Sequence, residues 1–172
     1  KSPEETLAIW GHDDALSDVV LAVRAVRPDV IITRFSTEGG GHGHHTASAI
    51  LAGEAFDAAS DPSQFPVEGF DPWQTDRLLR NTSSWRIPEG ADTSAWLRLD
   101  VGTFDPRTGE SFGEVAAASR TMHKSQGFGS SPSVGSTLEY FLPIAGTQPA
   151  DGESPLAGLD LTLARFEGTR AL

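Results

Sequence analysis

A short run of β-branched residues between two helical patterns sets the strongest limit on how this chain can fold. Residues 30–33 read VIIT, which is typical of a strand buried on both faces of a sheet. Apolar residues recur at helical spacing before it: Leu16, Val19, Val20, Val23 and Val26. A second stripe follows it: Ala47, Ile50, Leu51 and Ala55. This helix–strand–helix order predicts an α/β fold.

The first helix has a recognisable start and end. Asp13 or Asp14 is expected to cap it, because a short carboxylate accepts hydrogen bonds from the free amides of the first turn. Pro28 ends it, since the residue before a proline disfavours helical geometry. The rest of the chain predicts a short helix at 72–80, strands at 96–102 and 136–146, and a helix from Ser111 to Gly127 with Ser111 and Glu114 in capping-box spacing.

Three of the five histidines stand together at the start of the second helix, where residues 38–50 read EGGGHGHHTASAI. His42 and His45 are three positions apart, so both side chains can point into one cleft. The loop follows the 30–33 strand, and ligands of open α/β sheets bind at the carboxyl ends of the strands. The cluster therefore indicates metal or acid–base chemistry. The alternative is a surface loop in which the histidines recur by chance or cap the helix.

The two remaining histidines have simpler interpretations. His12 precedes Asp13 and Asp14, and we interpret this group as a helix N-terminus, because acidic residues favour that position. The alternative is a metal site that these three residues complete together with His45. His123 lies near the apolar stripe of its helix, so we expect a hydrogen-bonded, partly buried structural histidine.

Composition excludes several classes of partner. The net charge is −11 with only 13 lysines and arginines, so a nucleic acid or an anionic membrane surface would be repelled. No apolar stretch approaches the roughly 20 residues that span a bilayer. The chain has no cysteine, so a bound metal must be held by nitrogen and oxygen ligands.

Two segments resemble the PIG-L/LmbE family of zinc-dependent de-N-acetylases, and its long bacterial members in particular. They are RPDVIITRFSTEGGGHGHHTASAILAGEAFDAA and DVGTFDPRTGESFGEVAAASRTMHKSQGFG, and the likeness runs from about residue 3 to residue 145. It implies a Rossmann-like three-layer α/β sandwich with a mostly parallel sheet. It also implies hydrolysis of the acetamide of an N-acetylated sugar such as an N-acetylglucosamine conjugate. His45 matches the Zn²⁺ ligand, and His42 matches the histidine that stabilises the oxyanion or serves as the acid.

The family's first motif, His-Pro-Asp-Asp after the first strand, has no good match in this chain. Residues 12–15 read HDDA, which lacks the proline and is one residue too short. We therefore expect the first strand and its ligands to lie upstream. Residues 1–146 would be a partial deacetylase domain, inactive alone, and 147–172 a linker and the start of a following element. The cellular compartment is not assigned.

Three further questions stay open in the sequence. Arg34 ends the 30–33 strand and is a candidate contact for a polar or anionic group of the substrate, or else pairs with Glu38. A non-catalytic carbohydrate-binding or interaction module on the same scaffold is the alternative to the hydrolase. Homo-oligomer formation is the third open question.

Overall fold

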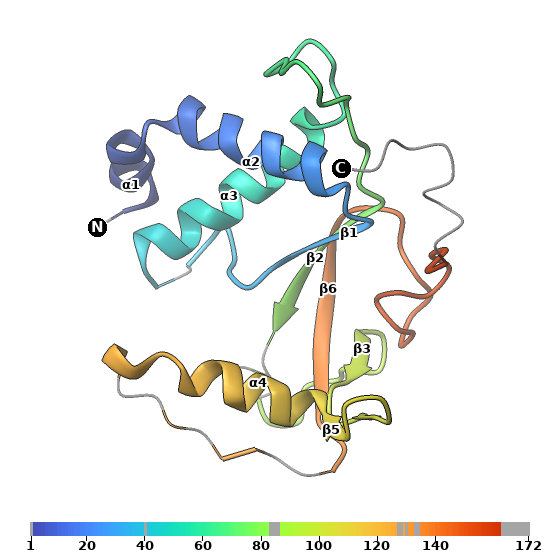
Figure 1. The fold of residues 1–172 in the computed structure, drawn as a ribbon. Helices are drawn as coiled ribbons and strands as arrows, with labels where there is room; N and C mark the ends of the chain where they lie inside the picture. Colours follow the sequence, from blue (N-terminus) through green and yellow to red (C-terminus); the bar gives the residue numbers. More distant parts are fainter. Residues whose placement is uncertain are drawn as a thin grey trace.

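A four-stranded mixed sheet runs through the middle of the protein in the computed structural model (Figure 1). The structure describes residues 2–39, 41–82, 87–126, 129, 131–132 and 135–162. The strands, in their order across the sheet, are β1 (Val30–Thr33), β2 (Arg77–Thr82), β6 (Leu138–Gly146) and β3 (Leu97–Asp100). β1 and β2 are parallel, whereas β6 is antiparallel to both of its neighbours. The α/β class is confirmed, and the parallel pairing expected of the sheet holds for one of its three strand pairs.

Three helices pack together beside β1. They are α1 (Pro3–Trp10), α2 (His12–Val26) and α3 (Gly43–Ala58), and both α1 and α2 contact α3 (Figure 1). Their shared core contains Leu16 and Val20 of α2 and Leu51 and Ala55 of α3. These are residues of the two apolar stripes, so the predicted helices at this end of the chain are confirmed. α1 was not predicted.

In the second half of the chain the structure agrees less closely with the elements predicted from the sequence. The strands predicted at 96–102 and 136–146 are present as β3 and β6. α4 (Phe112–Thr121) begins with the expected capping box, in which the Ser111 hydroxyl accepts from the Glu114 amide and the Glu114 carboxylate accepts from the Ser111 amide. The helix ends at Thr121, a short 3-10 helix η2 (Lys124–Gln126) follows, and the predicted stop at Gly127 lies outside the described residues.

Two predictions about local structure are wrong. The helix expected at 72–80 is replaced by β2, because a short apolar run such as Leu78–Leu79 has no periodicity that separates strand from helix, and pairing with β1 and β6 decides the outcome. The cap of α2 is Gly11 rather than Asp13 or Asp14, which lie inside the first turn. There the two carboxylates still interact favourably with the positive, amino-terminal end of the helix dipole.

The strand at 30–33 lies at the edge of the described sheet rather than in its centre. β1 has β2 as its one described partner strand, and Ile32 remains 51% exposed. The prediction that both faces are buried is therefore wrong for this strand among the described residues. Thr33 and the loop after it are brought to the sheet's edge, next to the start of α3.

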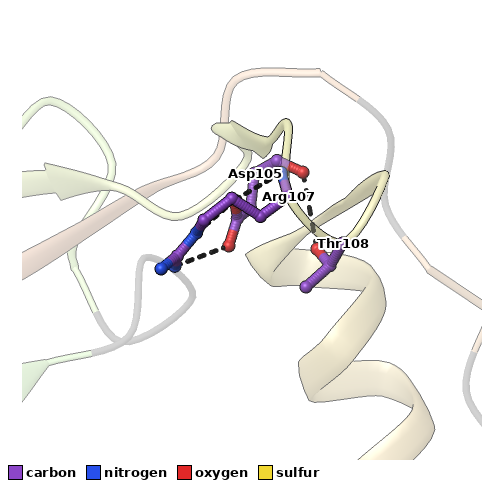
Figure 2. Close-up of polar contacts among 3 residues, drawn as sticks. All are labelled: Asp105, Arg107 and Thr108. Atoms are coloured by element: carbon purple, nitrogen blue, oxygen red, sulfur yellow. Dashed lines mark hydrogen bonds and ion pairs between the residues drawn. The ribbon is translucent and has the colours of Figure 1, made fainter.

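A tight hairpin joins β4 (Phe104–Asp105) to β5 (Glu110–Ser111). The Asp105 carboxylate accepts from the backbone and the guanidinium of Arg107, and its carbonyl accepts from the Thr108 hydroxyl (Figure 2). The neighbouring Arg107 lowers the pKa of Asp105. This hairpin leads directly into α4.

Part of the segment after residue 146 lies against the sheet. The buried guanidinium of Arg77 donates to the carbonyls of Pro155 and Ala157, and its Nε donates to the hydroxyl of Thr147. Pro155 is itself buried. The boundary at 146 stays a prediction. Among the described residues, no helix combines the length and the apolar character that crossing a bilayer requires.

A buried arginine joins α2 to the end of α3. Arg24 is 2% exposed, and its guanidinium donates to five backbone carbonyls. The acceptors are Ala58, Ala59, Asp61, Gln64 and Phe65, at 2.6–3.1 Å. One side chain therefore caps the carboxyl end of α3 and shapes the loop that follows it.

Replacing Arg24 by methionine should lower the free energy of unfolding by about 3 kcal/mol, because five carbonyls lose their donor and the methionine side chain cannot replace it. Chemical denaturation measures the change. Arg27→Met is the control at the carboxyl end of the same helix: Arg27 pairs with the exposed carboxylate of Asp71 at 3.6 Å, and its guanidinium lies 5.7 Å from the centroid of the Trp73 ring, so its loss should cost only about 1 kcal/mol. Equal losses from both variants would contradict the role given to Arg24.

His12 makes a second contact between α2 and α3. Its Nδ1 lies 2.8 Å from the Asp13 carboxylate and its Nε2 lies 2.8 Å from the Glu54 carboxylate. These hydrogen bonds, that of Asp13 first and that of Glu54 second, raise the pKa of His12. The folded protein therefore binds this proton more tightly than the unfolded chain does.

The stabilisation from His12 should be complete below pH of about 6.5, the ordinary value for histidine, and should be lost as the pH rises through the raised pKa of the folded state. Glu54→Gln should bring the pKa of His12 down and flatten this dependence. An NMR titration of the imidazole and thermal melts at several pH values measure both effects. Asp57→Asn, which removes an exposed charge from the same helix, should leave both nearly unchanged.

Candidate functional site

The candidate site lies where β1 passes through a glycine-containing loop into α3. Gly39 and Gly41 adopt φ values of 64° and 73°, in the left-handed region where a side chain would be strained. His42 follows with extended backbone and is the N-cap of α3. The glycines therefore allow the chain to reverse direction and present the histidines at the amino end of the helix.

His42 has one ring nitrogen engaged by the helix itself. Its Nδ1 accepts a hydrogen bond from the backbone amide of His44 at 3.2 Å. A nitrogen that accepts carries no proton, so the neutral ring holds its proton on Nε2. His42 is thus oriented with an N–H donor at its other edge.

His45 is oriented by an aromatic neighbour. Its ring stacks on Phe35 with centroids 3.8 Å apart and planes 2° from parallel. Stacking fixes the plane of the imidazole and covers one face, while the nitrogen atoms at the ring edge are not part of that contact. His45 is exposed in this structure, as are His42 and His44.

The structure brings the two predicted site histidines together. The ring centroids of His42 and His45 are 5.1 Å apart, and those of His42 and His44 are 4.6 Å apart. The catalytic role expected of His42 and the metal-ligand role expected of His45 stay predictions. No role is predicted for His44, which also contacts Trp10 at 5.3 Å between ring centroids.

No group of three or more histidine, aspartate and glutamate side chains with the arrangement of a metal site is found in the part of the chain that the structure describes. The alternative site of His12, Asp13 and Asp14 with His45 is therefore not formed by these residues. The His12 ring lies between Asp13 and Glu54 instead. What the structure offers to a metal is a pair of neighbouring imidazoles.

The other two candidates lie in different surroundings from those expected. The guanidinium of Arg34 pairs with the carboxylate of Glu139, with Nη1 3.6 Å from Oε2. The side-chain amide of Asn81 donates to the same oxygen at 2.8 Å. His123 follows α4 and is exposed, so the prediction that it is partly buried is wrong. The helix before it has no buried residue, and it therefore offers no interior for His123 to enter.

Two aromatic residues of this region were missed by the sequence reasoning. Phe35 supports His45, and Trp10 lies beside His44. The position of Phe35, directly in the loop between the strand and the histidines, is a signal that the sequence contains. Trp10 had no such signal, because it reaches the site through the packing of an unpredicted helix.

Sequence comparison finds relatives among curated deacetylases. All three described here are named 1D-myo-inositol 2-acetamido-2-deoxy-alpha-D-glucopyranoside deacetylase, one of them with the suffix 1. That of Geodermatophilus obscurus is 38% identical over 68 residues, covering 38% of this chain and 23% of the relative. That of Streptomyces scabiei is 33% identical over 101 residues, covering 58% of this chain and 30% of the relative. That of Frankia alni is 33% identical over 101 residues, covering 58% of this chain and 34% of the relative.

These matches span about a third or less of the relatives' own length (23%, 30% and 34%). No protein-family model matches the chain. The names of the relatives nevertheless agree with the resemblance carried by the histidine-rich segment, since each names a deacetylase of an acetamido sugar. Over part of its length, this chain is therefore similar to deacetylases of an acetamido sugar.

Proposed function

We propose that this chain is part of a zinc-dependent hydrolase that removes the N-acetyl group from an amino sugar or glycoconjugate. The observation that carries the proposal is the pair of imidazoles, His42 and His45, at 5.1 Å in the strand–loop–helix segment. The deacetylase names of the relatives support the same reaction, which is hydrolysis of an amide to acetate and an amine. On this proposal the mixed α/β domain is the Rossmann-like fold of that family.

The donor chemistry of the site fits zinc in kind. Neutral imidazole nitrogen is a common zinc ligand, and His45 presents its ring edge while Phe35 holds its plane. A catalytic zinc needs three protein ligands, more than the described residues supply. We therefore assign His45 as one ligand, and the others would come from outside the described residues. When bound, zinc supplies an acidified water and polarises the carbonyl group of the substrate.

His42 fits the role of an oxyanion donor better than that of an acid. Its Nδ1 accepts from the His44 amide, so the neutral ring carries its proton on Nε2, which is the donor atom of the ring. Negative charge develops on the acetamide oxygen as water adds to the carbonyl carbon, and a donor already in place there stabilises the transition state. Protonating Nδ1 would break the helix cap, which favours donation by the neutral ring.

Arg34 would contact a polar group of the substrate from the end of β1. Its guanidinium lies 3.6 Å from the carboxylate of Glu139, which weakens its positive field. A hydroxyl-bearing sugar can share a guanidinium that a carboxylate already neighbours, because the planar group has five donors.

A non-catalytic carbohydrate-binding module remains the second candidate function. The exposed histidine pair without a third metal ligand among the described residues is the observation that favours it. The two functions differ in one measurable respect: the module binds a sugar with no release of acetate.

Acetate release from N-acetylglucosamine conjugates by the full-length protein tests the reaction, with and without a zinc chelator. His45→Gln should raise the dissociation constant of zinc at least about a hundredfold and abolish turnover with it. His42→Asn keeps a good helix N-cap, so it should leave the zinc affinity and the melting temperature unchanged while lowering kcat about 10²–10³-fold.

His123→Gln is the matched control, since it removes an exposed histidine that follows α4 and does not belong to the cluster at the start of α3. It should change neither zinc affinity nor kcat. Acetate release that persists in His45→Gln, or that does not respond to the chelator, would contradict the proposal.

A zinc titration tests the assignment of the missing ligands. The 172-residue chain alone should bind zinc weakly, because His45 is one ligand where a catalytic site needs three, whereas the full-length protein should bind it tightly. Isothermal calorimetry measures both. Tight binding of equal strength by the short chain would show that these residues complete the site themselves.

A further inference from the structure

Five rings at the start of α3 and beside it form a row in the sense of successive contacts. Trp10 contacts His44 at 5.3 Å, His44 contacts His42 at 4.6 Å, His42 contacts His45 at 5.1 Å, and His45 stacks on Phe35 at 3.8 Å, all between ring centroids. The two histidines of the proposed reaction stand in this row. Trp10 forms one end of it, one ring away from His42.

Trp10 is brought to the row by the way α1 packs. Thr6 is buried and lies on the same face of the helix as Trp10, since residues four apart are neighbours on a helix surface. α1 contacts α3. Gly11, with φ 76°, then ends α1 directly after Trp10 and turns the chain into α2. The indole is thus held by the last turn of a packed helix.

Trp10 differs from the other tryptophans that the structure describes. Trp73 is half-buried, and its indole N–H donates to the Pro28 carbonyl at 2.8 Å. Trp96 is half-buried as well and packs edge-on against Tyr140. Trp10 remains 43% exposed, so a large part of the indole surface lies in contact with water next to the histidines. Covering an apolar aromatic surface of this kind is favourable.

We infer that Trp10 is a stacking platform for the sugar ring of the substrate, placed so that the acetamide attached to that ring reaches His42 and His45. The inference rests on the proposed function and names the part of the substrate that the histidines do not recognise. A sugar ring presents a face of C–H groups, which covers an indole, and a rim of hydroxyls, which stays available for polar contacts. His44 borders the platform on the side of the reacting group.

The simpler view is that Trp10 only packs against His44 and stabilises the contact of α1 with α3. The two views differ in what a substrate without a ring would experience. A structural defect would lower turnover of every acetamide alike, whereas loss of a platform affects the acetamides that carry a sugar ring.

The test compares N-acetylglucosamine with N-acetylethanolamine, an acetamide that has a hydroxyl but no ring, in the full-length protein. Trp10→Ala should lower kcat/KM about tenfold for the sugar, chiefly through KM, and less than twofold for the ringless compound. Tenfold corresponds to ~1.4 kcal/mol, in the range of an aromatic contact. Trp10→Phe keeps a flat ring and should recover most of the loss.

Ile9→Ala is the matched control, because Ile9 is the neighbouring residue on α1 and is 72% exposed. It should change kcat/KM less than twofold for both compounds. Equal losses for the two compounds in Trp10→Ala, or no loss for the sugar, would overturn the platform while leaving the proposed hydrolysis standing.

If the wild-type protein releases no acetate, the proposed function fails and the platform is tested by binding alone. Saturation-transfer NMR with N-acetylglucosamine should then show contact with wild-type protein and its loss in Trp10→Ala, with contact retained in Ile9→Ala. No contact with the wild-type protein, or undiminished contact in Trp10→Ala, overturns the platform.

Discussion

The position of α3 depends on side chains that bind the backbone at both of its ends. At the carboxyl end the buried guanidinium of Arg24 binds five carbonyls of α3 and the loop after it. At the amino end the imidazole of His42 accepts from the His44 amide. Because the free backbone groups of a helix lie in its first and last turns, these contacts remove the positions at which α3 would otherwise fray. The geometry of the candidate site follows from a helix that is fixed in this way.

Local contacts at the amino end of α3 give His42 and His45 different chemical properties. His42 is bound through Nδ1 and therefore presents an N–H, whereas His45 is held by the face of Phe35 and presents its ring edge. A donor and a metal ligand are different chemical requirements, and in this arrangement local contacts, not residue type, separate them. This division is also what makes the proposed roles of the two residues testable one at a time.

Several of the elements that the sequence predicted have local determinants. The stripe of α2, the stripe of α3 and the capping box of Ser111 and Glu114 each lie within one stretch of chain, and each is found in the structure. β2 depends on pairing with β1 and β6, which are distant in sequence, so its apolar residues alone did not separate strand from helix. The closeness of His42 and His45 was predictable from the sequence, because the two residues are only three positions apart. The contacts of Arg34 with Glu139 and of Trp10 with His44 were not, because strand and helix packing brings these residues together.

The charges around the candidate site bear on the kind of acetamide that it would accept. The chain carries a net charge of −11, and the one cationic side chain proposed to contact the substrate, Arg34, already has the carboxylate of Glu139 at 3.6 Å. An anionic substrate would therefore meet repulsion at long range and a partly compensated arginine at short range. Aromatic and imidazole rings, in contrast, attract an uncharged ring through the burial of apolar surface, and that attraction does not depend on net charge. The proposed platform at Trp10 and the weakened field of Arg34 thus favour the same substrate, a neutral sugar that carries an acetamide.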